Sequence, residues 1–204
     1  MNTPKAHRIL CRGQHLDFLC TVAGWEYVAR RTRSQGVLIV AVTEEQRLLL
    51  IEQLRPPVNA RTIELPAGVI DRDETPRLAA LRELEEETGY RARSVRPIFA
   101  GSTSPGVTDD QNTICIATGL RRIDDPLLDR QFPDGTRKHR HLRGAEGENE
   151  NVAVWEVPLQ LVPRWLSRRR GRGNVIDLRI CAGLFFLDQP LTPAQFRAPD
   201  VVLP

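Results

Sequence analysis

Acidic side chains are packed closely near the middle of the chain, where Glu83, Glu85, Glu86 and Glu87 follow one another. On a helix, Glu83 shares one face with Glu86 and Glu87, which come three and four residues later. Like charges this close weaken a helix unless positive charge lies against them. Hard oxygen ligands on a rigid helix suit Mg²⁺, which keeps several waters and is usually completed by a substrate phosphate. The spacing therefore favours a metal site, although acidic clusters in general are more often solvated helix faces.

The flanking residues predict the helix that carries these carboxylates. Thr75 can cap its start, Pro76 has the backbone angle of a first helical residue, and Gly89 can end it in the left-handed conformation. We therefore expect a helix over about residues 76–88. Arg82 lies four residues before Glu86 and can hold and orient that carboxylate.

Apolar patterning indicates mainly β structure around this helix. We expect a hairpin around Gly24 and a buried strand pair over 37–42 and 48–53. Further strands are expected over 95–106, 112–120 and 151–159, and helices over 159–166 and 174–187. Residues 121–147 are rich in Arg, Asp, Gly and Pro and are expected to form a long loop, either functional or disordered.

Length and composition are those of an ordinary globular protein. The 204 residues are 41% hydrophobic and 27% charged, which argues against disorder of the whole chain. No apolar run approaches the roughly 18 residues of a membrane span, and the N-terminus lacks an apolar signal region. We therefore expect a cytoplasmic protein with no membrane partner. The four cysteines show no C-x-x-C spacing and are expected to be reduced, mostly core residues.

Basic residues gather in three runs, although the net charge is only +3. The runs cover residues 30–33, 137–143 and 168–172. Such runs are usually solvated, and otherwise they meet phosphate on a nucleotide or a nucleic acid. Composition alone leaves both readings open.

The order of residues around the acidic cluster resembles the Nudix box, G-x5-E-x7-R-E-U-x-E-E-x-G-U, where U is a bulky aliphatic residue. Every fixed position is present, and the final U is the aromatic Tyr90 instead of an aliphatic residue. The matching residues are Gly68, Glu74, Arg82, Glu83, Glu86, Glu87 and Gly89. The resemblance implies an α/β fold, a Nudix α/β/α sandwich with a mixed sheet, and a hydrolase that acts on a nucleoside diphosphate linked to another moiety.

The same resemblance implies roles for these residues. Two or three Mg²⁺ ions, or Mn²⁺, would be held by the carbonyl of Ala67 and by Glu83, Glu86 and Glu87. Arg82 would orient the carboxylates as part of the catalytic machinery. Glu74 would fix the loop rather than touch the metal.

Features outside the box resemble the ADP-ribose (ADP-sugar) pyrophosphatase subfamily. Pro105 lies 16 residues after Gly89, at the subfamily's marker position, although a plain turn also explains a proline there. The segment "IEQLRPP…TIELPAG" implies that Arg55 binds substrate phosphate and that Glu64 makes a polar contact near the adenine or the site floor. A surface salt bridge is the alternative for Arg55.

An N-terminal element resembles one that is exchanged across a homodimer in this subfamily. "GWEYVARRTR" places Trp25 where an aromatic residue stacks on adenine in the partner's site. A core tryptophan is the plain alternative. We therefore expect a dimer-exchanged β element over 1–35, a Nudix domain over 36–190 and an irregular tail over 191–204.

The acid-rich run "GAEGENENVAVWEV" resembles the segment that supplies the subfamily's general base. Aligned in this way, Glu148 is the base and Glu150 is a further catalytic metal ligand. The two roles could be swapped, and Glu146 is a third choice. The basic loop before this run would be a lid that meets phosphate, or simply disordered.

These features together predict Mg²⁺-dependent hydrolysis of ADP-ribose to AMP and ribose 5-phosphate. The expected partners are the nucleotide-sugar substrate and a second copy of the chain, with nucleic acid disfavoured. A GDP- or UDP-sugar diphosphatase and a non-catalytic nucleotide sensor remain as alternatives.

Overall fold

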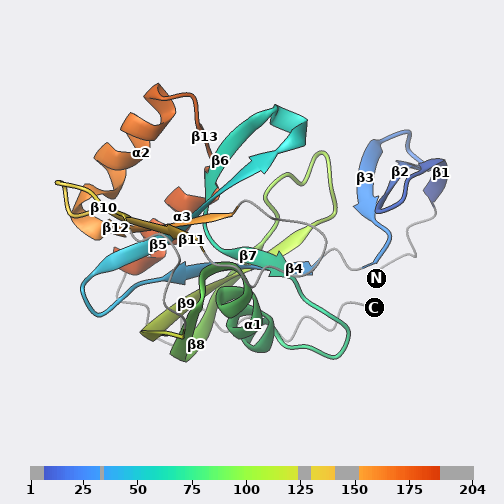
Figure 1. Ribbon diagram of the computed structural model, residues 1–204. Helices are drawn as coiled ribbons and strands as arrows, with labels where there is room; N and C mark the ends of the chain where they lie inside the picture. The colour runs from blue at the N-terminus through green and yellow to red at the C-terminus, as the bar shows by residue number, and fades with distance from the viewer. Residues whose placement is uncertain (1–6, 33–34, 124–129, 141–151, 189–204) are drawn as a thin grey trace.

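Two mixed β-sheets form the centre of the fold (Figure 1). The computed structural model describes residues 7–32, 35–123, 130–140 and 152–188. A four-stranded sheet has the order β7-β4-β9-β8, with β7 Ala67–Val69, β4 Gln35–Ala41, β9 Gln111–Arg122 and β8 Tyr90–Gly101. A six-stranded sheet has the order β10-β11-β12-β5-β6-β13, with β10 Arg130–Gln131, β11 Arg137–Arg140, β12 Ala153–Pro158, β5 Arg47–Arg55, β6 Ala60–Glu64 and β13 Val175–Ile176.

Helices cover the sheets from both sides, as the α/β/α expectation requires. Helix α1, Pro76–Thr88, packs on one side through a cluster that includes Ala79 and Leu84. Helices α2, Val162–Gly171, and α3, Arg179–Asp188, pack on the other side. Two short 3₁₀ turns complete the elements, η1 Pro56–Val58 and η2 Leu159–Leu161. None of the helices in the described part of the chain has the length and apolar character needed to cross a membrane.

Strand β5 serves both sides because successive side chains of a strand point to opposite faces. Leu48 and Leu50 join the cluster beneath α2 and α3, whereas Leu49 joins the cluster beneath α1. All three are fully buried. The alternation continues with polar side chains further along the strand. Glu52 points to the side of α2 and α3, and Gln53 points to the opposite side.

The N-terminal residues form a small sheet of their own, which lies at one edge of the molecule (Figure 1). Strands β1 His7–Arg12, β2 Leu16–Thr21 and β3 Glu26–Arg30 pair antiparallel. Gly24 has φ 83° in the β2–β3 turn, which confirms the expected hairpin. Val28 connects this sheet to the rest of the chain, since its N–H donates to Val107 O at 2.9 Å.

Three of the expected elements differ in the structure. Strands β4 and β5 are buried but lie in different sheets, and they are linked only near their connecting turn, by the isolated bridge between Val42 and Leu48 and by the bond from Thr43 N–H to Arg47 O at 2.9 Å. Residues 159–161 form a 3₁₀ turn and α2 begins at Val162. Residues 175–176 are strand β13, which pairs parallel with β6, so the last helix begins only at Arg179.

The expected long loop also contains regular structure. Strands β10 and β11 form a hairpin across Phe132–Thr136, where Gly135 has φ 81° and its N–H donates to Phe132 O at 2.9 Å. His139 within it is buried, and its Nδ1 lies 3.6 Å from Glu156 Oε1. Residues 130–140 are therefore part of the six-stranded sheet, and residues 124–129 and 141–147 of the expected loop lie outside the described residues.

The cysteines are free, as expected, but only half of them are core residues. Cys20 and Cys115 are buried, whereas Cys11 and Cys181 are exposed. Cys11 lies on β1 and Cys181 lies on α3.

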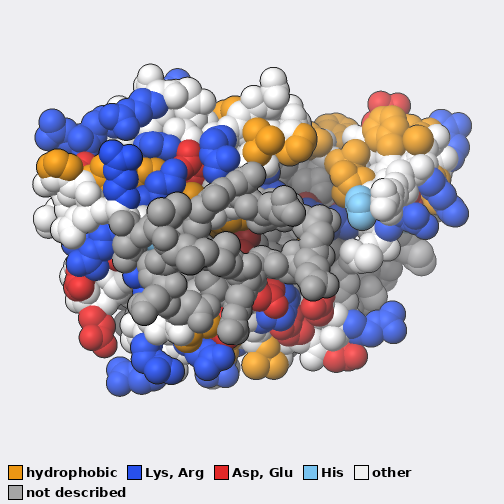
Figure 2. Space-filling model, viewed as in Figure 1, with side chains coloured by type: hydrophobic (Ala, Val, Ile, Leu, Met, Phe, Trp, Pro, Cys, Tyr) orange, Lys and Arg blue, Asp and Glu red, His pale blue; other side chains and the backbone are white. Residues whose placement is uncertain are grey.

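Glu52 is the polar group that β5 presents to the α2 side. Its buried carboxylate accepts hydrogen bonds from Trp155 Nε1 at 2.9 Å, Lys138 Nζ at 3.0 Å and Arg169 Nη2 at 2.7 Å. Lys138 and Arg169 also lie 4.6 and 4.7 Å from the Trp155 ring centroid. Figure 2 shows basic side chains gathered over this part of the surface. Members of two basic runs are thus used to neutralise a buried carboxylate.

The pKa of Glu52 follows from these contacts. Burial raises it, but the bonds from Trp155 and Lys138 and the charges of Lys138 and Arg169 outweigh burial and lower the pKa to about 2. Because the folded pKa lies below 4.5, the ordinary value for a glutamate, Glu52 stabilises the fold fully above pH 4.5. The contribution is lost as the pH falls from there towards 2.

Substitution Glu52→Gln should lower the free energy of unfolding by about 2–4 kcal/mol at pH 7, because it leaves buried cations without a counter-charge. Urea unfolding of the variant and the wild type measures the difference. The difference should shrink when both proteins are unfolded at successively lower pH below about 4.5.

Glu45→Gln is the matched control. Glu45 is 58% exposed and pairs with Arg47 and Arg137 at the surface, so its loss should change the free energy of unfolding by less than about 1 kcal/mol. Equal effects of the two substitutions would contradict the role given to Glu52.

Candidate active site

Helix α1 has the ends that the sequence predicts. Thr75 Oγ1 accepts a hydrogen bond from Leu78 N–H at 3.3 Å, and Pro76 is the first helical residue. Gly89 ends the helix with φ 73°, and its N–H donates to Glu85 O at 2.9 Å. A side chain at Gly89 would be strained in this left-handed conformation. Both ends of the helix that carries the glutamates are therefore fixed by hydrogen bonds.

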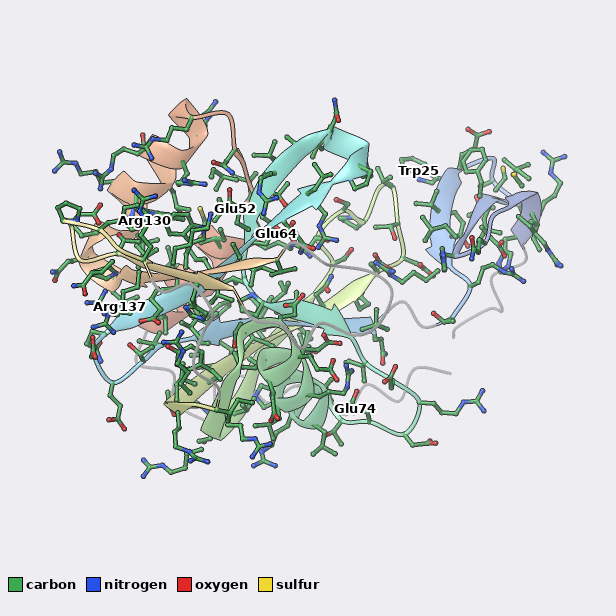
Figure 3. All side chains as sticks on the ribbon, in the orientation of Figure 1. Trp25, Glu52, Glu64, Glu74, Arg130 and Arg137 are labelled. Atoms are coloured by element: carbon green, nitrogen blue, oxygen red, sulfur yellow. The ribbon has the colours of Figure 1, made fainter. Side chains whose placement is uncertain are left out.

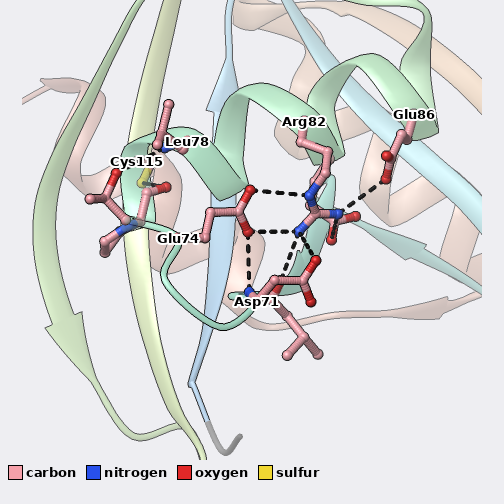
Figure 4. A network of polar contacts seen from close by, with 10 residues as sticks. Asp71, Glu74, Leu78, Arg82, Glu86 and Cys115 are labelled. Atoms are coloured by element: carbon pink, nitrogen blue, oxygen red, sulfur yellow. Dashed lines mark hydrogen bonds and ion pairs between the residues drawn. The ribbon is translucent and has the colours of Figure 1, made fainter.

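Arg82 joins the helix to the loop before it (Figure 4). Its guanidinium donates to both carboxylate oxygens of Glu74, at 3.1 and 3.0 Å, and to Val69 O at 3.0 Å. It also donates to Glu83 at 2.7 Å and to Glu86 at 3.1 Å. Bonds to Glu74 and then to Glu83 raise the pKa of Arg82 despite its partial burial. The orienting role expected for Arg82 thus has a direct geometric basis.

Glu74 fixes the loop, as the sequence suggests. Its carboxylate accepts the Asp71 N–H at 3.1 Å while it binds Arg82. Both carboxylate oxygens of Glu74 are engaged in this way (Figure 4). Glu74 is a positioning residue in this arrangement.

The β7 strand approaches the helix closely at Gly68. A Cβ atom placed on Gly68 would lie 1.9 Å from the Glu83 carboxyl carbon, so only glycine fits there while Glu83 keeps this conformation. Beside it, Ala67 N–H donates to Glu87 Oε2 at 2.8 Å. Burial raises the pKa of Glu87 to about 8, with further increases from the charges of Glu83 and Glu64, while the Ala67 N–H lowers it. Two carboxylates are thus held against one short strand.

These residues border one cavity of about 450 Å³. One wall is acidic, with Glu83, Glu86 and Glu87 from α1 and Asp71 from the loop. The remaining lining comes from other elements, chiefly Arg30, Gln53, Arg55, Thr103, Asp110, Asn112 and Arg179. The cavity therefore joins a carboxylate wall to a wall that contains three arginines, which suits a phosphorylated ligand that binds together with a cation.

Six of the predicted site residues meet at this cavity. They are Arg55, Ala67, Arg82, Glu83, Glu86 and Glu87. Glu64 is buried behind the wall and holds Arg55 with two hydrogen bonds, at 2.8 and 2.7 Å. Trp25 and Pro105 do not line the cavity, and Glu148 and Glu150, like Glu146, lie outside the described residues.

Trp25 lies between the N-terminal sheet and the main body (Figure 3). Its Nε1 donates to Gly106 O at 3.1 Å, and the side chain is still largely exposed. The contact brings Trp25 next to the turn that contains Pro105. The predicted Trp25 and Pro105 are therefore neighbours, at some remove from the carboxylates.

Sequence reasoning missed the cavity residues Arg30, Gln53, Asp110, Asn112 and Arg179. A signal existed for Gln53, because it lies two residues before Arg55 on β5 and so shares its face. Its side chain is buried, and its Oε1 has no hydrogen-bond partner among the residues that the structure describes. No local signal existed for Arg179, which reaches the cavity through the pairing of β13 with β6.

The carboxylate oxygens at this cavity are the type of ligand that a hard divalent cation prefers. Within the described ranges, no three or more His, Cys, Asp or Glu side chains are already arranged as a metal site. Glu83, Glu86 and Glu87 nevertheless offer oxygen atoms to one cavity, and a cation there would offset the burial that raises the pKa of Glu87. These three carboxylates are the residues that would hold the ion.

Gly68→Ala should weaken the binding of Mg²⁺ by about 10–100-fold, because the new methyl group displaces the Glu83 carboxylate. Isothermal calorimetry measures the affinity. Gly171→Ala is the control, since a Cβ there would meet nothing within 4 Å. Unchanged affinity in folded Gly68→Ala would contradict the placement of Glu83 at the ion.

Comparisons with known proteins agree with this geometry. The profile of the NUDIX domain matches residues 32–166. An ADP-ribose pyrophosphatase of Bacillus subtilis (strain 168) is 39% identical over 90 residues, which cover 44% of this chain and 49% of that protein. An ADP-ribose pyrophosphatase of Saccharomyces cerevisiae is 30% identical over 165 residues, which cover 76% and 66%. A methanol dehydrogenase activator of Bacillus methanolicus is 40% identical over 87 residues, 43% and 47% of the two chains.

The fold has a counterpart among solved structures. A crystal structure of an ADP compounds hydrolase superimposes with a TM-score of 0.64 at 20% identity, covering 89% of both chains. The chain spans about half the length of the two bacterial relatives that it matches. Since the profile covers most of the chain and includes the loop and helix that carry the acidic wall, the chain belongs to the Nudix family.

Proposed function

We propose that the protein hydrolyses the pyrophosphate bond of ADP-ribose in a Mg²⁺-dependent reaction, giving AMP and ribose 5-phosphate. The observation that carries this proposal is the cavity that carboxylates and arginines line together. A pyrophosphate needs both kinds of group, because its charge is neutralised by cations while guanidinium forks orient its oxygens. The names of the relatives support ADP-ribose as the substrate.

Five of the cavity residues have a place in this reaction. Arg55 is held by Glu64 and would bind a phosphate oxygen with the N–H groups that Glu64 leaves free. Glu83, Glu86 and Glu87 would hold Mg²⁺, which, when bound, neutralises the pyrophosphate and activates a water. Arg82 keeps two of these carboxylates in place. Glu148 is proposed as the base that removes the proton from the water, and Glu150 as a further ligand.

The N-terminal sheet is proposed to serve a second copy of the chain. Trp25 is exposed and does not line the cavity of its own chain. Ile9, Leu16 and Phe18 on the same sheet are each more than one-third exposed, and a partner would cover apolar surface of this kind. A homodimer in which residues 1–35 reach across would let Trp25 stack on the adenine bound by its partner.

Mg²⁺-dependent turnover of ADP-ribose should be lost in Glu87→Gln, with kcat/KM falling roughly 1000-fold because a ligand of the ion is removed. The assay is release of AMP from a panel of ADP-ribose, ADP-glucose, GDP-mannose and UDP-glucose, with Mg²⁺ and with EDTA. Glu85→Gln is the matched control, since Glu85 lies on the same helix, pairs with Arg91 and does not border the cavity.

The outcomes of this assay separate the candidate functions. Preferred cleavage of GDP-mannose or UDP-glucose would replace ADP-ribose by another sugar nucleotide. Tight nucleotide binding without turnover of any substrate would contradict the enzyme and favour a sensor.

Mixing two inactive variants tests the shared site. Trp25→Ala and Glu87→Gln chains should each be poorly active, yet co-refolded dimers should exceed the sum of the separate activities, because each mixed dimer contains one site with both residues intact. The measurement is ADP-ribose hydrolysis of the mixture, with sedimentation equilibrium to establish the dimer. A monomer, or no recovery on mixing, would contradict the exchange.

A further inference from the structure

We propose that Arg179, the first residue of α3, is a second pyrophosphate-binding arginine beside Arg55, and that Glu64 and Asp177 position the two guanidinium groups. The proposal rests on the proposed function and adds to it a residue that comes from the end of the described chain. Arg179 borders the cavity together with Arg55 and the acidic wall. It is the geometry of its neighbours that gives it this role.

Glu64 is shared by the two arginines. Its Oε1 and Oε2 accept from Arg55 Nε at 2.8 Å and Nη2 at 2.7 Å. The same Oε2 lies 3.8 Å from Arg179 Nη2. One buried carboxylate therefore holds both guanidinium groups side by side at the cavity wall, although its own side chain is only 4% exposed. Substrate cannot readily displace a carboxylate that is engaged in this way.

Asp177 fixes the direction of Arg179. Its Oδ1 accepts the backbone N–H of Arg179 at 2.8 Å, and its Oδ2 accepts the side-chain Nε at 2.7 Å. The Nη2 group also contacts this carboxylate. The remaining N–H groups of the guanidinium are the ones available to a ligand, and the side chain is 31% exposed.

The backbone that presents Arg179 is tied to the strand that presents Glu64. Strand β13 pairs with β6, with Ile176 opposite Ile63, and Asp177 N–H donates to Ile63 O at 3.0 Å. The next residue, Ile180, is fully buried in the core. Arg179 is thus placed by rigid elements rather than by a loop, which is the arrangement that keeps a binding group at its working distance.

Two guanidinium groups match the chemistry of a pyrophosphate. Its two phosphoryl groups each present oxygens that a planar fork can bind, and the carboxylate wall on α1 lies across the same cavity. Arg30 also borders the cavity, but its Nε faces Asp110 at 3.4 Å, and it comes from the N-terminal sheet. The pair of Arg55 and Arg179 is therefore the one that a single carboxylate aligns.

The experiment compares Arg179→Gln with Arg164→Gln. Both remove one positive charge, and Arg164 lies exposed on α2 and does not border the cavity. Binding of inorganic pyrophosphate in the presence of Mg²⁺ is measured by calorimetry, and ADP-ribose kinetics are measured alongside. Adenosine, which has no phosphate, is the competing ligand used as a specificity control.

Arg179→Gln should weaken pyrophosphate binding by about 10–100-fold and raise KM for ADP-ribose with a smaller change in kcat, as expected for a lost charge-assisted hydrogen bond. Adenosine inhibition should be unchanged, and Arg164→Gln should behave as the wild type. A folded Arg179→Gln protein with pyrophosphate affinity equal to that of Arg164→Gln would overturn the inference.

The two proposals fail in different ways. Wild-type protein that binds pyrophosphate through Arg179 but hydrolyses no nucleotide sugar would contradict the proposed function and leave Arg179 in place. Turnover of ADP-ribose with no effect of Arg179→Gln would do the reverse. Should Arg179→Gln not fold, Arg179→Met, which keeps an unbranched apolar stem, takes its place with the same criteria.

Discussion

The guanidinium of Arg82 is the interaction on which the acidic wall depends. Four carboxylates and one backbone carbonyl converge on it, from both α1 and the loop before the helix. Without a cation at this point the glutamates would repel one another and the loop would lose its anchor at Glu74. Its position also allows Gly68 to lie against Glu83. One arginine thus determines both the shape of the loop and the direction of the carboxylates.

Strand β5 carries polar side chains on both of its faces, and the side chains of each face have a different role. On one face, cations and the Trp155 ring surround Glu52, and its carboxylate links β11, β12 and α2 to the sheet. On the other face, Gln53 and Arg55 border the cavity. The alternation of side chains along a strand is enough to keep the two apart. A buried charge on one face therefore supports the fold while its neighbours remain available to a ligand.

The local parts of this structure could be predicted, and the non-local parts could not. Helix α1 has its own cap, its own C-terminal glycine and a fixed spacing of glutamates, so its ends and its carboxylate face followed from neighbouring residues. The partner of β4 did not, because β4 pairs with β9, which is far along the chain. The β10–β11 hairpin was mistaken for loop, since its Arg, Gly and Pro content concealed a short turn between paired strands. Arg179 was missed because its position depends on β13, only two residues long.

The start of α3 has a consequence for how this protein can change. Gly183 lies one turn beyond Arg179, and a Cβ there would come within 2.8 Å of Val40 and 2.9 Å of Leu65. The close packing of Gly183 therefore also determines where Arg179, at the first turn of the helix, is placed. Leu65, which Gly183 contacts, directly follows Glu64 in sequence. Substitutions at Val40, Leu65 or Gly183 would therefore change the affinity for the ligand even when the protein remains folded. Selection for stability and selection for affinity would act here on the same residues, so the two traits could not drift independently.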